Sequence, residues 1–271
     1  MAESQVTSAG YLARRNPTVK AAVALLLSVF LLLAIDPATP LLFLAATLVA
    51  GIALGRVPPG QYARAFVPLV LIGLGFVWTN ALFATAGPGD TFWPVGPLRV
   101  SARGLAFGIA IALRGVAIGA LSLTFVLTTD PTGLVVSLVR HARLPFRIGY
   151  ALLAGYRFLP FLAEEYQQVR LAHRLRGLTL DQSPGARLGA PLRLAFPLLA
   201  GAARRAARIG VAMDSRGFSA ADGRTRTTLR HVPFGAADAL FAVLCLAVAA
   251  GLFSLSAAAG WLRLWDGRFA A

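Results

Sequence analysis

Apolar residues gather into five long blocks, and this clustering limits the fold of the chain more than any other feature. A helix needs about 20 mostly apolar residues to cross a bilayer, with a usual range of roughly 17 to 25. Charged residues are only 14% of the chain, against roughly a quarter in soluble domains. We therefore predict an all-α integral membrane protein with about five transmembrane helices, at about 19–35, 41–55, 65–86, 104–128 and 234–258. The second block is short for a full span.

The distribution of basic residues orients these spans. The chain has 26 Lys and Arg against 11 Asp and Glu, and 16 of the basic residues lie between the fourth and fifth blocks. Cytoplasmic loops carry the excess of Arg and Lys in membrane proteins. We therefore expect the N-terminus in the cytoplasm. The turn at Asp36, the loop 87–100 and the C-terminal tail are then outside. Because the basic residues alternate with apolar spans, nucleic-acid binding is not expected.

The basic region between the last two blocks predicts a cytoplasmic helical module. The chain then divides into an N-terminal membrane region (1–128), the module (129–232) and a C-terminal transmembrane helix with its tail (233–271). Within the module, apolar residues recur at steps of three and four over about 147–176 and 187–216. This spacing is typical of amphipathic helices.

Local signals refine the module. A shorter helix, about 131–143, is expected first, because Asp130 and Pro131 suit the N-cap and the first helical position. Pro160 is expected to kink the first long helix or divide it in two. Ser183-Pro184-Gly185 is expected to form a loop between the long helices.

Both long helices end in an Arg-Gly pair. The first ends in Leu175-Arg176-Gly177 and the second in Ser215-Arg216-Gly217. Glycine favours the left-handed conformation that follows a helix, and a cation in the last turn suits the helix dipole. An arginine displayed at such a tip can also bind a carboxylate of a partner protein in a forked geometry. Capping and docking are compatible interpretations.

These residues resemble a known family. The start Thr128-Thr129-Asp130-Pro131, the run Tyr156-Arg157-Phe158-Leu159-Pro160 before Glu164-Glu165, and above all the two tips are similar to the transmembrane T component of energy-coupling factor (ECF) transporters. That family includes the cobalt/nickel-transport Q subunit and the biotin-transport membrane subunit. Its usual tip is Ala-Arg-Gly, so both tips here depart at the first position and keep the arginine and glycine.

The resemblance implies a non-catalytic scaffold and coupling subunit of an ABC importer in the bacterial or archaeal plasma (inner) membrane. Its partners would be two cytoplasmic ABC-type ATPases, which bind the ATP, and a small membrane subunit that captures a vitamin, cobalt or nickel. The chain would need no cofactor of its own. The residues implied for ATPase docking are Arg174, Arg176, Gly177, Asp214, Arg216 and Gly217. Those implied for coupling and contact with the substrate subunit are Leu159, Pro160, Leu199 and Ala203.

Arg114 interrupts the fourth apolar block. A charge at that depth costs about 2.5–3.5 kcal/mol on insertion scales, so it normally has a partner or a water-lined site. It could line a substrate path, or it could pair with a polar group such as Asn80 or extend toward an interface. We favour the structural role.

Two other classes of function remain as alternatives. A self-sufficient permease would carry internal repeats around a midplane site, and the five blocks show no convincing repeat. An intramembrane hydrolase is suggested by Glu164-Glu165 followed by Arg170, but the spacing differs by one residue because Val169 occupies the expected place. The single cysteine and the three scattered histidines predict no metal site.

Overall fold

The structure of the protein is a computed structural model, which describes residues 10–83, 92–95, 98–176, 184–218 and 232–261. The chain divides into two compact units. One comprises Met1–Ala142 with Val232–Ala271, and the other comprises Arg143–His231. Because α5 (Pro131–His141) belongs to the first unit, the membrane unit includes the short helix that was predicted as part of the cytoplasmic module.

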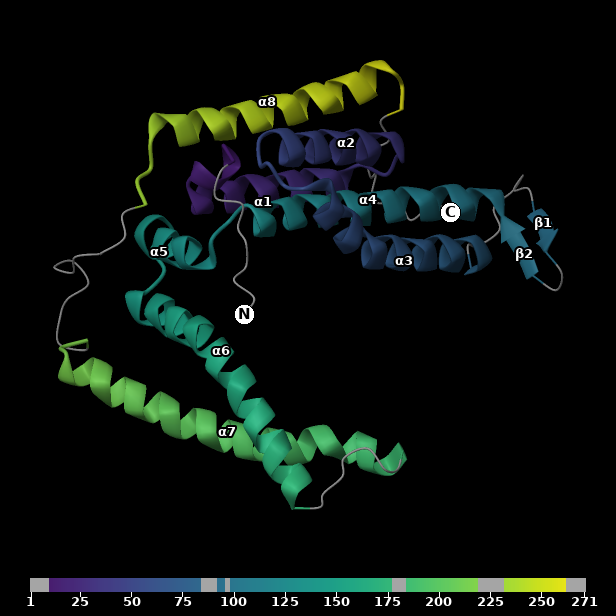
Figure 1. Ribbon diagram of the computed structural model, residues 1–271. Coiled ribbons are helices and arrows are strands. Elements are labelled where there is room, and N and C mark those ends of the chain that lie inside the picture. The colour runs from purple at the N-terminus through teal and green to yellow at the C-terminus, as the bar shows by residue number, and fades with distance from the viewer. Residues whose placement is uncertain (1–9, 84–91, 96–97, 177–183, 219–231, 262–271) are drawn as a thin grey trace. The chain divides into compact units, whose positions relative to one another are not determined.

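The membrane unit is built almost entirely from helices that run alongside one another (Figure 1). A short 3-10 helix, η1, comes first, and the two strands form one small antiparallel hairpin with Phe92 opposite Ser101. This hairpin lies within and just after the predicted loop 87–100. The elements are η1 (Leu12–Arg14), α1 (Pro17–Leu33), α2 (Ala38–Ala53), α3 (Pro59–Phe83), β1 (Phe92–Val95), β2 (Leu98–Ser101), α4 (Ala102–Leu127), α5 (Pro131–His141) and α8 (Ala236–Ala258).

All five predicted apolar blocks form helices, which confirms the all-α membrane fold. In the part of the chain that is described, α3, α4 and α8 are long and apolar enough to cross a bilayer. The other two apolar helices, α1 and α2, are shorter, with 17 and 16 residues. Large apolar side chains cover the outside of these helices, among them Leu25 at 67% exposure and Leu71 at 62%. Such a surface suits lipid and not water.

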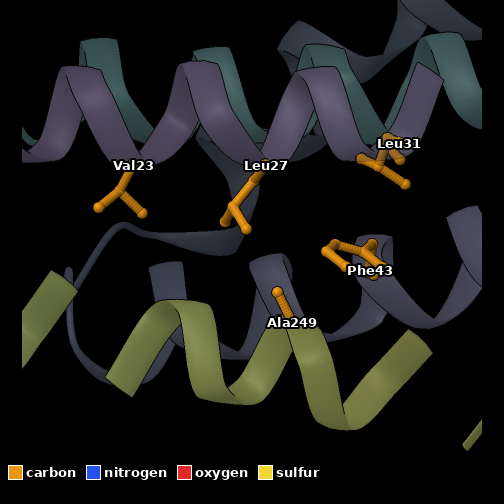
Figure 2. Close-up of a cluster of buried hydrophobic side chains, with 6 residues drawn as sticks. Val23, Leu27, Leu31, Phe43 and Ala249 are labelled. Carbon is orange, nitrogen blue, oxygen red and sulfur yellow. The ribbon is translucent and has the colours of Figure 1, made fainter. Parts of the chain in front are cut away.

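The core of the membrane unit lies between α1, α2, α4 and α8. Figure 2 shows Val23, Leu27 and Leu31 of α1 turned toward Phe43 of α2 and Ala249 of α8. The three α1 residues recur every four positions, so they occupy one face of the helix. Ala117 of α4 completes the buried cluster. The opposite face of α1 stays exposed, and this asymmetry orients the helix in the unit.

Small residues let α4 pack closely against α3. A Cβ atom added at Gly108 would lie 2.9 Å from the Cα of Val77, and one added at Gly119 would lie 2.7 Å from a Leu69 methyl carbon. Close backbone approach through small residues is the usual basis of helix packing in membranes. The hydroxyls of Tyr62 and Thr124 add a 2.8 Å hydrogen bond between the same two helices.

A buried polar network ties the start of α1 to α5 and α8. The Asn16 side chain caps α1 by accepting from the Thr18 N–H at 3.0 Å, and its Oδ1 also accepts from the Ser137 hydroxyl at 2.7 Å. The Asp238 carboxylate accepts from the Asn16 N–H at 3.0 Å. Asn16, Ser137 and Asp238 thus satisfy one another's polar groups, as burial requires. Asp130 caps α5 through the Thr132 and Gly133 N–H groups, as predicted.

Candidate docking site on two crossing helices

The second unit consists of two long helices, α6 (Phe146–Leu175) and α7 (Pro184–Ser215), which cross each other (Figure 1). Pro160 lies within α6, which continues through it as a single element and is not divided. The expected loop at Ser183-Pro184-Gly185 is wrong for its last two residues, because α7 already begins at Pro184. Proline suits a first helical position, where its missing N–H would have no intrahelical partner.

The crossing point is formed by a glycine, an ion pair and aromatic rings. Gly201 is buried, and a Cβ atom at this position would collide with the Glu165 carboxylate of α6. The Arg205 guanidinium lies 3.8 Å from the Glu165 carboxylate and 5.2 Å from the Phe158 ring centre. Gly201 therefore lets α6 and α7 approach closely, and the side chain of Arg205 packs on α6 instead of extending into solvent.

The first arginine tip is exposed. Arg176 is the residue directly after α6, and its N–H donates to the Ala172 carbonyl at 3.2 Å. Leu175 beside it is 89% exposed, and Arg174 and Arg176 are also exposed. The guanidinium of Arg176 is therefore available to another protein. Gly177 lies outside the described residues.

The second tip has the same layout, and its backbone is closed by a Schellman motif. Gly217 has φ of +79°, in the left-handed region, and its N–H donates to the Asp214 carbonyl at 2.9 Å. The Phe218 N–H donates to the Met213 carbonyl at 3.1 Å. These two bonds are the 5→2 and 6→1 pair that ends many helices at a glycine. Arg216, Gly217 and the neighbouring Asp214 are all exposed.

An aromatic contact fixes the chain just beyond this tip. The Phe218 ring packs edge-on against Phe146 at 5.6 Å and against Tyr150 at 6.1 Å between ring centres. Because Phe146 and Tyr150 begin α6, the C-terminal end of α7 is held against the N-terminal end of α6. Phe218 was not among the predicted site residues, although an aromatic residue directly after an Arg-Gly pair is the available signal.

The residues expected to contact a substrate subunit lie on the exposed surface of this unit. Leu159 is 56% exposed and Leu199 is 68% exposed, and Pro160 and Ala203 are exposed as well. Leu199 and Ala203 lie four residues apart, so they share a face of α7. Exposed apolar side chains of this size indicate a surface for protein or lipid.

Arg114 has no hydrogen bond from its Nε or Nη2 atoms to any described residue, although both atoms are shielded from solvent. The side-chain amide of Asn80, the partner suggested by the sequence, donates to the Phe76 carbonyl at 2.9 Å. The structure therefore does not join Arg114 to Asn80. Over the described ranges, no three His, Cys, Asp or Glu side chains gather as a metal site would need.

Several known proteins are similar in sequence to this chain. The family described as cobalt transport protein, CbiQ, matches residues 9–228. The energy-coupling factor transporter transmembrane protein EcfT of Acidaminococcus fermentans is 29% identical over 259 residues, which cover 92% of each chain. The EcfT of Heliobacterium modesticaldum is 30% identical over 79% of this chain and 82% of the relative. That of Bacillus subtilis is 28% identical over 76% and 79%.

The fold and the candidate site define a multi-pass membrane protein that carries a module of two crossing helices with arginine tips. The family match covers most of the chain, including α1 to α7. The chain belongs to the CbiQ family of transmembrane components of energy-coupling factor transporters, which confirms the resemblance carried by the two Arg-Gly tips.

Proposed function

We propose that the chain is the scaffold and coupling subunit of an ECF-type importer. Two cytoplasmic ABC-type ATPases bind the module through Arg176 and Arg216, one at each tip. A small membrane subunit that captures the substrate binds the exposed apolar faces of α6 and α7. The chain carries the movement of the ATPases into the membrane and has no catalytic site or cofactor of its own.

The observation that carries this proposal is the exposure of both arginines, each one residue beyond the end of a long helix. A guanidinium at a fixed helix end presents its forked donors without a further loss of backbone freedom on binding. The Schellman motif at Gly217 and the Phe218 contacts support a rigid second tip. An ATPase surface with a carboxylate at the base of a groove has the complementary chemistry.

Long helices joined at one crossing point suit the coupling role. The contact at Gly201, Glu165 and Arg205 holds α6 to α7, so a displacement at one tip is transmitted along a helix instead of being absorbed by a loop. The basic surface of the module fits acidic partners and a cytoplasmic location. In the proposed orientation the N-terminus is in the cytoplasm and the C-terminus is outside, in a bacterial or archaeal plasma membrane.

The cargo follows from the capture subunit and not from this chain. A vitamin or a transition-metal ion, such as cobalt or nickel, fits the class of importer. The family description names cobalt, while the EcfT relatives are named only for energy coupling. Co-purification of the capture subunit from the native membrane identifies the cargo class.

The docking role is tested with Arg176→Ala and Arg216→Ala in the full complex. Each variant removes one charge-assisted contact worth about 2 kcal/mol, so we expect roughly 30-fold weaker binding of one ATPase. The double variant is expected to lose both ATPases and transport. Binding of labelled ATPases to the detergent-purified chain measures these losses, and uptake by proteoliposomes measures transport.

Arg208→Ala is the matched control. Arg208 is an exposed arginine of α7, but it lies on the shaft of the helix and not at its tip. It carries the same charge, so its loss tests whether general attraction between basic and acidic surfaces is sufficient. Wild-type binding and transport by both tip variants, or equal losses in Arg208→Ala, would refute the docking role.

A further inference from the structure

Asp36 and Arg114 are two charged residues of the membrane unit that the proposed function does not use. Asp36 follows α1, in the turn that leads into α2, and is only 3% exposed. Its Oδ2 accepts from the Thr39 N–H at 2.6 Å, whereas its Oδ1 is buried without a hydrogen-bond partner among the described residues. An orphaned oxygen on a buried carboxylate calls for a partner.

Arg114 has the complementary deficiency. Its Nε and Nη2 atoms are shielded from solvent and also lack partners in the described part of the chain. The negative charge of Asp36 acts electrostatically on this guanidinium. A buried anion and a half-buried cation thus have unused hydrogen-bonding groups within range of each other's field.

The register of α1 against α4 places Arg114 level with the C-terminal end of α1, three residues before Asp36. The Lys20 Nζ donates to the Thr128 carbonyl at 2.8 Å, which aligns the start of α1 with the end of α4. From Lys20 to Leu33, the last residue of α1, is about 20 Å of helix, and from Thr128 back to Arg114 is about 21 Å. The shared cluster of Leu27, Leu31 and Ala117 follows the same antiparallel register.

The turn that carries Asp36 is held in place. Thr39, whose N–H binds the Asp36 carboxylate, is fully buried, and its hydroxyl lies 2.6 Å from the hydroxyl of Ser256 in α8. Asp36 is therefore a buried, fixed group and not a flexible surface side chain. Buried polar groups without a direct partner are commonly satisfied by an ordered water.

We propose that Asp36 and Arg114 form a water-bridged ion pair inside the membrane unit, which fastens the middle of α4 to the turn between α1 and α2. Together with the Lys20 contact, it fixes α4 to α1 at two levels. Because α4 leads through Thr128 and Asp130 into α5, the pair prevents α4 from sliding along its axis and holds the start of α5 in place. Asp36 and Arg114 are positioning residues in this role, and the role does not depend on which partners the module binds.

The test uses the full chain in detergent and the variants Asp36→Asn, Arg114→Gln and their combination. Each single variant leaves one buried charge without its counter-charge, so we expect Tm to fall by about 5 °C or more. The double variant removes both charges, and its Tm is expected to recover by at least about half of the larger loss. Additive losses in the double variant, or single variants with wild-type Tm, would overturn the pair.

Lys20→Met combined with Asp36→Asn is the matched control. It removes a buried cation about 20 Å from the end of α1 that leads to Asp36, and its effect on Tm is expected to add to that of Asp36→Asn. Arg114→Lys, which keeps the charge, is expected to restore most of the loss seen in Arg114→Gln. If both neutral single variants fail to accumulate, accumulation of the double variant supports the pair and its failure overturns it.

Infrared difference spectra give a readout that a purely packing role would not change. Wild-type protein minus Asp36→Asn isolates the band of this carboxyl group. We expect the band of an ionised carboxylate in the wild type and of a protonated carboxylic acid in the Arg114→Gln background, because loss of the nearby positive charge disfavours the buried anion. An ionised band that is unchanged by Arg114→Gln would contradict the proposal.

Discussion

Gly217 offers a sharp test of how the second tip is held. Its φ of +79° lies in the left-handed region, and a Cβ atom there would meet no atom within 4 Å. Replacement by alanine therefore adds no collision with the rest of the protein. The cost is that of forcing an L-residue into the left-handed conformation, about 1–2 kcal/mol. Gly217→Ala should thus loosen the tip without disturbing any packing.

Gly210 provides a control in the same helix. It lies in the interior of α7, and a Cβ atom at this position also meets nothing within 4 Å. Here the backbone is helical, so alanine is favoured over glycine by about 1 kcal/mol. The same chemical change, seven residues away, is therefore expected to have the opposite sign.

Hydrogen exchange of the full chain in detergent measures both effects. Peptides that contain the N–H groups of Gly217 and Phe218, the two donors of the Schellman motif, are followed by mass spectrometry. A loss of 1–2 kcal/mol corresponds to exchange that is about 5- to 30-fold faster in Gly217→Ala, and Gly210→Ala should slow exchange around its own position by up to about 5-fold. Gly217→Asn should fall between, because asparagine tolerates the left-handed region.

Unchanged or slower exchange at the tip of Gly217→Ala would refute this account of the second tip. The same variants connect the tip to docking. If rigidity of the backbone positions Arg216, Gly217→Ala also weakens ATPase binding, whereas Gly210→Ala leaves binding at the wild-type level. Equal binding by Gly217→Ala and the wild type would separate the exposed arginine from its cap.

The remaining predictions concern two close contacts. Gly201→Leu should force α6 and α7 apart at Glu165 and speed hydrogen exchange of α7 around the crossing. Gly210→Leu, which enters open space, should have neither effect. Equal exchange in the two variants would contradict the close crossing at Gly201. Lys20→Met should leave the Thr128 carbonyl without its donor, cost about 1–3 kcal/mol and lower Tm by several degrees. Leu25→Met at an exposed position of α1 should leave Tm unchanged, and a similar Tm in both variants would disprove the role of the lysine.

The apolar pattern was sufficient to predict every membrane helix, because burial in lipid imposes a minimum length of apolar sequence that few other structures require. The start of α5 and the end of α7 could be predicted from local chemistry, since Asp130 and Gly217 each satisfy a specific need of a helix terminus. The start of α7 was placed too late, because Pro184 favours a loop and a first helical position alike. Only the rest of the chain decides between the two.

Contacts between distant segments could not be predicted from sequence. Arg205 and Arg208 are the same type of residue and have similar neighbours in the sequence. Arg205 nevertheless packs on aromatic rings of α6, whereas Arg208 is exposed. Their difference depends on where α6 crosses α7. In the same way, Arg114 was recognisable as a charge that needs a partner, but the depth of Asp36 follows from the register of α1 against α4. The docking roles of Arg176 and Arg216 remain predictions from the family.

The unequal lengths of the apolar helices have a consequence for the surrounding lipid. α1 and α2 measure about 25 Å and 24 Å, less than the hydrocarbon thickness of about 30 Å, whereas the 26 residues of α4 extend over about 39 Å. The bilayer must thin beside the short helices α1 and α2, while α4 has to tilt. Each ångström of such mismatch costs a fraction of a kcal/mol. We therefore expect the length of the lipid acyl chains to affect the stability of this protein, with short-chain bilayers relieving the strain beside α1 and α2.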